Sequence, residues 1–132
     1  MIVIDTSVVI AVLGAEPGFE AFEQAMASAA ELRISAPLVL EATQVASRWH
    51  DRAAIGAVDA MLAAFEVEIA ELTLAQLSLA RTAFLEFGKG RGHPANLNQM
   101  DCFSYALAKS LDAPLLFKGE DFLHTDVRRF QT

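Results

Sequence analysis

Short apolar runs alternate along the chain with longer segments in which apolar residues recur at intervals of three and four positions. The short runs have the length and the branched side chains of buried strands. They span residues 1–4, 32–35, 67–72, 114–117 and 127–130. The longer segments have the spacing of amphipathic helices that cover a core. They span residues 6–13, 17–30, 37–50, 52–65, 73–90 and 98–111.

Residues that commonly begin helices mark four of the longer segments. Pro17 and Pro37 suit a first turn, and Thr73 suits an N-cap. Asn98, with Asp101 three residues later, has the spacing of a capping pair. Strands that alternate with helices predict a mostly parallel sheet, of about five strands here, with helices on both faces. The expected fold class is therefore α/β, a three-layer α/β/α sandwich.

Length and composition both indicate a single domain that spans residues 1–132. A chain of 132 residues with 54% hydrophobic side chains can form one core, and no repeat or Pro/Gly/Ser-rich linker divides it. The apolar residues 1–14 include Asp5 and are too few to cross a bilayer, so we expect no membrane anchor and no signal peptide. One cysteine, Cys102, allows no internal disulfide and suits a cytoplasmic location.

The net charge of -7 argues against a protein that coats nucleic acid through a broad basic surface. It does not exclude a nuclease, because carboxylates that hold a divalent cation have their charge cancelled by that ion. The positions of the acidic residues therefore matter more than their total.

Four acidic residues follow strand ends or begin helices. Asp5 comes directly after the first strand, and Glu41 lies in the first turns of the helix after the second strand. Asp101 opens the helix before the strand at 114–117, and Asp121 lies just beyond that strand. Because strand C-termini and helix N-termini share one edge of a parallel sheet, we expect all four to lie at that edge.

Four carboxylates in one cleft repel one another strongly unless a cation lies among them. Mg²⁺ and Mn²⁺ prefer oxygen ligands and keep several waters, so such a site suits phosphate chemistry with a metal-activated water. Each acid also has a local explanation. Asp5 and Asp101 suit helix N-termini, Asp121 suits a turn after Gly119, and Glu41 suits a solvated position.

Three stretches resemble the PIN-domain ribonucleases, and among them the VapC-type toxins of bacterial toxin–antitoxin pairs. "MIVIDTSVVIAVL" resembles the first motif with its acid at Asp5, and "SAPLVLEA" resembles the second with its acid at Glu41. "GRGHPANLNQMDCFSYALAKSLDAPLLFKGEDFLHTDV" is similar to the third and fourth motifs, whose acids fall on Asp101 and Asp121. The resemblance covers the whole chain.

The resemblance implies an Mg²⁺- or Mn²⁺-dependent endoribonuclease that leaves a 5′-phosphate and a 3′-hydroxyl. It makes Asp5 and Asp101 the main metal ligands, completed by Glu41 and Asp121. It gives Thr6 and Ser7 an auxiliary hydrogen-bonding role, for which helix capping is the alternative. It also implies a homodimer or a hetero-oligomer with a VapB-type antitoxin. Asp126 is either an auxiliary acid or a turn residue.

Two further features bear on RNA. Lys89, Arg91 and His93 lie in a glycine-rich stretch before the Asp101 helix, where they either contact RNA phosphates or form an ordinary exposed loop. Met100 stands where many relatives have a small residue before the third acid, so substrate access at this position differs from that of those relatives.

Other functional classes also place acids at strand ends. A PIN-like RNA-processing nuclease without an antitoxin shares every motif above. A receiver-like phosphate-accepting domain needs an aspartate at the end of a middle strand, and the run at 67–72 offers none that fits. A dehalogenase-type phosphatase needs a second aspartate where Ser7 stands. An interaction domain without catalysis is the remaining alternative.

Overall fold

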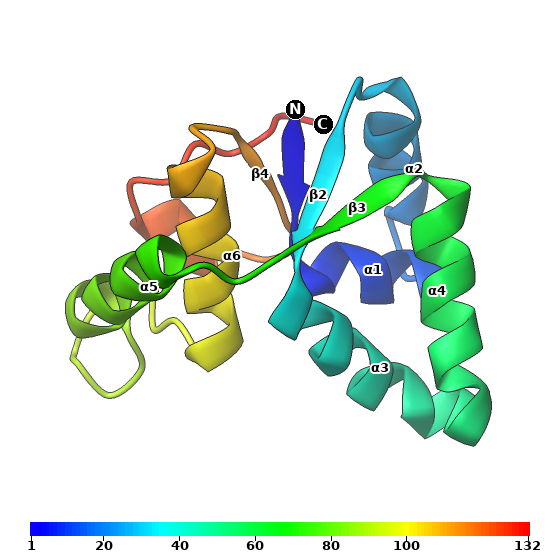
Figure 1. Ribbon diagram of the computed structural model, residues 1–132, viewed down its shortest axis with the longest axis horizontal. Helices are drawn as coiled ribbons and strands as arrows, with labels where there is room; N and C mark the ends of the chain where they lie inside the picture. Colours follow the sequence, from blue (N-terminus) through cyan, green and yellow to red (C-terminus); the bar gives the residue numbers. More distant parts are fainter.

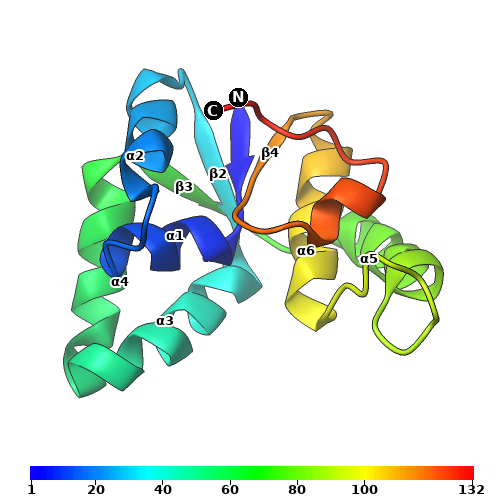
Figure 2. The same ribbon diagram turned by 180° about the vertical axis from the view of Figure 1, so that it is seen from behind.

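The strands bury side chains on both faces because helices cover both sides of the sheet (Figures 1 and 2). The computed structural model describes residues 1–132. Its four strands are parallel and lie in the order β3-β2-β1-β4. They are β1 (Ile2–Ile4), β2 (Leu32–Ser35), β3 (Val67–Ala70) and β4 (Leu115–Leu116). The predicted three-layer α/β/α class is confirmed, with four strands.

Two helical layers enclose this sheet. One layer consists of α1 (Thr6–Leu13), α2 (Phe19–Ser28), α3 (Ala36–His50) and α4 (Ala54–Ala64). The other consists of α5 (Leu74–Phe87) and α6 (Gln99–Ser110), which pack against each other (Figure 1). Short 3-10 helices are η1 (Asp51–Ala53) and η2 (Asp121–His124). None of the helices combines the length and the apolar character needed to cross a bilayer.

Alternation along β1 divides the core into two clusters. Ile2 and Ile4 join the cluster beneath α1 to α4, whereas Val3 joins the cluster beneath α5 and α6. Leu116 and Leu115 in β4 are divided in the same way. This two-residue period is the geometry of a strand buried on both faces.

Two expectations about individual elements are wrong. The predicted strand at 127–130 contributes only one isolated bridge, from Arg129 to Leu115, because β4 is too short to pair with more. Pro17 does not lie in a first turn, because Gly18, with φ of 88°, is the N-cap of α2. Pro37, Thr73 and the Asn98–Asp101 pair begin their helices as predicted.

The strand order reverses beside β1. The chain passes from β1 to β2 and β3 through α1 to α4, and it reaches β4 on the other side of β1 through α5 and α6. In open parallel sheets, ligands bind at the carboxyl ends of the strands where the order reverses. Both chain termini lie at the opposite edge (Figure 1).

Candidate active site

Asp5 lies at the carboxyl end of β1 and is the N-cap of α1. Its Oδ2 accepts a hydrogen bond from the Ser7 N–H at 3.0 Å, and its Oδ1 accepts one from the buried Ser104 hydroxyl on α6. The side chain is buried. Asp5 therefore caps a helix and at the same time joins α1 to α6.

Asp101 lies in the first turn of α6, in a capping box with Asn98. The Asn98 N–H donates to Asp101 Oδ2 at 2.9 Å, and the Asp101 N–H donates to Asn98 Oδ1 at 2.8 Å. Ser104 is three residues further along the same helix face, so its bond to Asp5 brings Asp101 toward Asp5.

Three of the predicted acids, Asp5, Glu41 and Asp121, lie close enough to Asp101 to raise its pKa. Burial raises the pKa of Asp101 to about 7, and repulsion from Asp5 adds to this. The Asn98 N–H opposes the shift in the pKa of Asp101, and the carboxylates of Asp121 and Glu41 increase it further. The structure therefore brings together four acids from four separate parts of the chain.

Glu41 lies on α3 and is partly buried. Burial raises the pKa of its carboxyl, a hydrogen bond from Thr6 lowers it, and the charge of Asp5 raises it further. A raised pKa makes the Glu41 carboxylate a stronger base than an exposed glutamate, which suits a group that accepts a proton.

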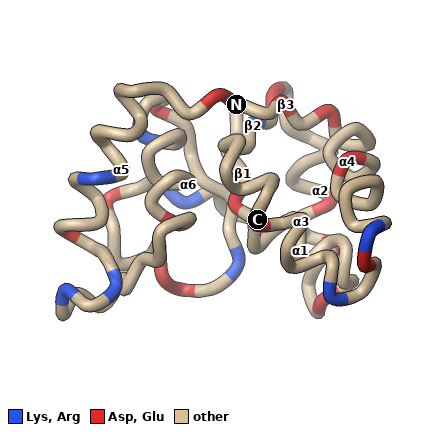
Figure 3. The backbone as a smooth tube through the Cα atoms, turned by 60° about the horizontal axis from the view of Figure 1, so that its bottom comes forward, with Lys and Arg blue, Asp and Glu red and all other residues tan.

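These groups line a cleft of about 320 Å³. Its lining includes Asp5, Glu41 and Asp101, together with Thr6, Ser7, Asn98, Glu16 and Lys118. Asp121 begins η2 beside this cleft without lining it, and its influence on Asp101 is electrostatic. Figure 3 turns this edge of the sheet toward the viewer, with the acidic residues in red.

The lining fits a hard divalent cation. It offers carboxylate, hydroxyl and amide oxygens, and no cysteine or histidine contributes to it. Burial and the charges of Asp5, Asp121 and Glu41 raise the pKa of Asp101, and a bound cation would offset this repulsion. No group of three His, Cys, Asp or Glu side chains is arranged to hold an ion directly. Water ligands or side-chain rotation must therefore complete the coordination of a bound ion.

Thr6 and Ser7 have structural partners within the cleft. The Thr6 hydroxyl donates to the Leu38 carbonyl at 3.4 Å, and the Ser7 Oγ accepts from the Lys118 N–H at 3.0 Å. Together they connect the start of α1 to α3 and to the turn after β4. The N-cap of α1 is Asp5, so neither hydroxyl has the alternative capping role, and a role of Thr6 or Ser7 at a carboxylate or phosphate stays a prediction.

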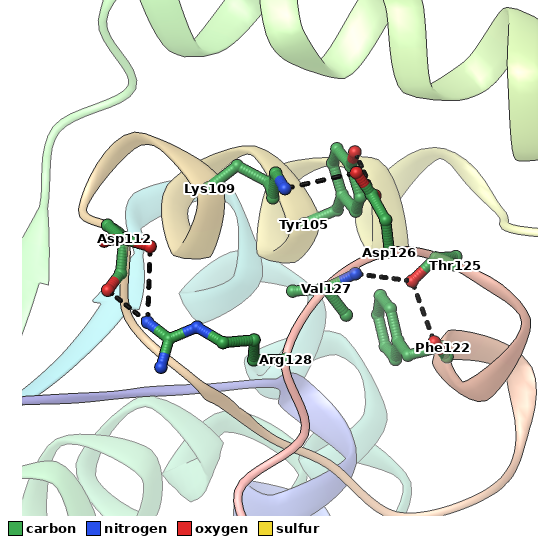
Figure 4. A network of polar contacts seen from close by, with 8 residues as sticks. All are labelled: Tyr105, Lys109, Asp112, Phe122, Thr125, Asp126, Val127 and Arg128. Atoms are coloured by element: carbon green, nitrogen blue, oxygen red, sulfur yellow. Dashed lines mark hydrogen bonds and ion pairs between the residues drawn. The ribbon is translucent and has the colours of Figure 1, made fainter.

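Asp126 belongs to a different network, between α6 and the C-terminal segment (Figure 4). The Tyr105 hydroxyl donates to Asp126 Oδ1 at 2.6 Å, and Lys109 Nζ donates to Oδ2 at 3.1 Å. The bond from Tyr105 is the main cause that lowers the pKa of Asp126. Asp126 does not line the cleft.

Lys89, Arg91 and His93 lie on the loop between α5 and α6, and none of them lines the cleft. Arg91 Nε donates to the Leu85 carbonyl at 3.3 Å, and His93 Nδ1 accepts from the Ala95 N–H at 3.0 Å. The His93 ring also meets the Phe87 ring edge-on at 5.1 Å.

Met100 is partly buried and is likewise not part of the lining of the cleft.

Three residues at the site, Ser104, Glu16 and Lys118, were not identified from the sequence motifs. Ser104 could have been found from its position one turn after Asp101 on the same helix face. Glu16 and Lys118, whose side chains form an ion pair at 2.9 Å, have no such signal in the sequence.

Sequence comparisons assign this chain to one family, and structural comparison shows one shared fold. The model of the PIN domain family matches residues 2–128. Ribonuclease VapC28 of Mycobacterium tuberculosis is 42% identical over 127 residues, covering 96% of each chain, and Ribonuclease VapC42 of the same species is 37% identical over the same coverage. The crystal structure of VapC20 from M. tuberculosis, described as a sarcin-ricin loop cleaving toxin, superimposes over 100% of both chains.

That superposition has a TM-score of 0.79 at 18% identity. VapBC2 from Rickettsia felis, whose structure contains a promoter DNA fragment, gives a TM-score of 0.74 at 15% identity, over 99% of this chain and 98% of that one. At these identities the two structures establish a shared fold.

Proposed function

Because the chain belongs to the PIN-domain family, among the VapC ribonucleases, we propose that it is a metal-dependent endoribonuclease and the toxin of a VapBC-type pair. The observation that carries this proposal is the meeting of Asp5, Glu41, Asp101 and Asp121 at one sheet edge, where burial and then repulsion from the other three acids raise the pKa of Asp101. Membership of this family removes the receiver-like and dehalogenase-like alternatives.

The proposed reaction is hydrolysis of an RNA phosphodiester. Asp5 and Asp101 hold an Mg²⁺ or Mn²⁺ ion, and Glu41 and Asp121 complete the site directly or through water. Such an ion lowers the pKa of a nearby water and neutralises charge on the phosphate oxygens. Glu41 would accept a proton of the attacking water, whose oxygen would bond to phosphorus as the bond from phosphorus to O3′ breaks. The departing O3′ would take its proton from solvent water. The products are a 5′-phosphate and a 3′-hydroxyl.

The surrounding residues hold these acids in position. Ser104 and the Ser7 N–H restrain the two oxygens of Asp5, and Asn98 restrains Asp101 through the capping box. Each restrained carboxylate oxygen keeps a further lone pair for a cation or a water.

The central test compares the wild type with Asp5→Asn and Asp101→Asn. Both variants should lose more than the ~10–100-fold in activity that removal of an outer-sphere partner costs, and should relieve growth arrest on expression.

Chelation of divalent ions should abolish cleavage by the wild type, and added Mg²⁺ or Mn²⁺ should restore it. Asp59→Asn, on the exposed face of α4, is the matched control. Full metal-dependent cleavage by both site variants would remove the nuclease assignment.

The toxin role requires a protein partner. An apolar groove of about 550 Å³ between α5 and α6, lined mainly by hydrophobic side chains, supports such contacts, either with a VapB-type antitoxin or with a second copy of this chain. Coexpression with the product of a small neighbouring gene for a DNA-binding protein should restore growth. An RNA-processing nuclease without an antitoxin, by contrast, should cleave RNA without arresting growth.

A further inference from the structure

Lys118 is the only cationic residue that lines the acidic cleft. It is the second residue after β4, and its N–H donates to Ser7 Oγ at 3.0 Å. The next residue, Gly119, has φ of 100° and turns the chain toward η2. The backbone of Lys118 is therefore fixed beside the start of α1, and its side chain projects at the mouth of the site.

The ammonium of Lys118 is paired with Glu16, a carboxylate of the same cleft other than the four metal-site acids. Its Nζ lies 2.9 Å from Glu16 Oε1, and the two side chains are 40% and 36% exposed. Glu16 is itself positioned because its N–H donates to the Ala11 carbonyl at 2.9 Å, at the end of α1. The pKa of Asp101 is shifted by burial, by three carboxylates and by the hydrogen bond with Asn98. The charge of Lys118 is not among these causes.

We propose that Lys118 is a substrate-contact residue whose ammonium leaves Glu16 to bind a non-bridging oxygen of the RNA phosphate in the cleft. This inference rests on the proposed nuclease function. A phosphodiester that enters a cleft lined by several carboxylates needs positive charge in addition to the metal ion. A lysine provides a compact charge on a flexible stem, and an exposed ion pair such as that with Glu16 is weak enough to exchange.

Glu16 then acts as a positioning residue. While the cleft is free of RNA, it keeps the ammonium away from Asp5 and Asp101, where a bound lysine would compete with the metal ion. The alternative is a purely structural clasp between the turns after α1 and β4. The hydrogen bond from the Lys118 N–H to Ser7 joins the turn after β4 to the start of α1, and this second link between the same two elements survives loss of the ammonium.

The test compares the wild type with Lys118→Met, Lys118→Arg and Glu16→Gln. Sequencing of RNA ends after digestion of total bacterial RNA by the wild type identifies a cleavage site, and a short single-stranded RNA copied around that site is the probe. Lys118→Met should raise KM at least about tenfold with little change in kcat, and Lys118→Arg should restore most of the loss. Glu16→Gln should leave KM unchanged or lower it.

Salt dependence gives an independent readout. The slope of log affinity against log salt should fall by about 0.7 in Lys118→Met, because one phosphate contact of a single strand is lost. An unchanged KM and slope would overturn the inference, and so would equal losses in Lys118→Met and Glu16→Gln, which indicate a clasp. Absence of metal-dependent cleavage by the wild type instead overturns the proposed function, and this inference with it.

Discussion

Asp5 accepts hydrogen bonds from the Ser7 N–H and from the Ser104 hydroxyl, one on each carboxylate oxygen. Asp101 likewise accepts a capping bond while it faces the other acids. The local explanation for each acid and the functional one are therefore compatible. A capping bond fixes the direction of a carboxylate, and that direction decides whether four acids can share a cation.

Ser104 supports Asp5 from inside α6, where its side chain is fully buried. Ser104→Ala should lower RNA cleavage ~10–100-fold, because Asp5 loses the partner that orients it. The unpaired oxygen should also reduce the free energy of unfolding by about 1–3 kcal/mol. Ser110→Ala is the control, because that hydroxyl bonds only the Leu107 carbonyl of its own helix. Unchanged cleavage by Ser104→Ala would show that Asp5 needs no support from α6.

The raised pKa of Asp101 makes the stability of the metal-free protein depend on pH. In the unfolded chain this carboxyl loses its proton near its ordinary value of 3.8, whereas the folded protein keeps the proton up to about 7. Between these values the folded state binds more protons than the unfolded state. The contribution of Asp101 to stability is therefore fully present below 3.8 and is lost as the pH rises to about 7.

Asp101→Asn should accordingly raise the Tm of the metal-free protein by several degrees near pH 8 and by less near pH 5. The asparagine keeps an oxygen that accepts the bond from the Asn98 N–H, so the capping box is retained. Thermal melts in the presence of a chelator measure this, with Asp59→Asn as the exposed control. An equal shift at both pH values would show that the charge of Asp101 is not the cause.

At the scale of elements, α6 presents some of its side chains to the cleft and others to the C-terminal segment. Asp101 and Ser104 face the cleft side, whereas Tyr105 and Lys109 bind Asp126 (Figure 4). The helix can serve both because residues one position apart differ by about 100° around its axis.

Asp126→Asn should retain metal-dependent cleavage, whereas Asp121→Asn should lose most of it. The bond from Tyr105 lowers the pKa of Asp126, so the stability from this group is present above the ordinary pKa of 3.8 and lost as the pH falls through the lowered value. Asp126→Asn should therefore lower the Tm at neutral pH. Cleavage assays and melts of both variants decide the matter, and a loss of cleavage equal to that of Asp121→Asn would place Asp126 in the site.

At the scale of the whole molecule, the acidic cleft and the apolar groove lie on different parts of the surface. The cleft lies between α1, α3 and α6, and the groove lies between α5 and α6. Leu85 in the groove is 61% exposed and lies there with Leu77 and Phe84, which are 38% and 40% exposed, so the groove presents a contiguous apolar surface of the kind that contacts a partner. The two surfaces share no lining residue, although neighbouring residues at the start of α6 contribute to both.

Leu85→Glu should weaken self-association, because a charge in the groove must be desolvated when a second copy binds there. Light scattering during gel filtration over a range of concentrations measures the mass. Leu123→Glu, at an exposed leucine on η2, is the control. A dimer that persists in Leu85→Glu, with an unchanged Tm, would assign self-association to another face.

Much of the architecture was predictable because its signals are local. Periods of two and of three to four residues indicated the strands and helices, and capping residues marked several helix starts. The shared edge for the four acids followed from the geometry of any parallel sheet. The prediction of a strand at 127–130 was wrong, because the pairing of a strand depends on the length of the neighbouring strand. The neighbour here, β4, has only two residues.

The sequence by itself determined the α/β class, the one acidic edge and the family, since period, capping and motif are properties of neighbouring residues. Only the tertiary structure decided that Ser104 supports Asp5, that Asp126 binds Tyr105, and that Lys118 meets Glu16. The Ser104 and Lys118 contacts join residues 99 and 102 positions apart. Such pairs form because the fold brings the start of α6 and the turn after β4 to the carboxyl end of β1, and no pattern of adjacent residues encodes that arrangement.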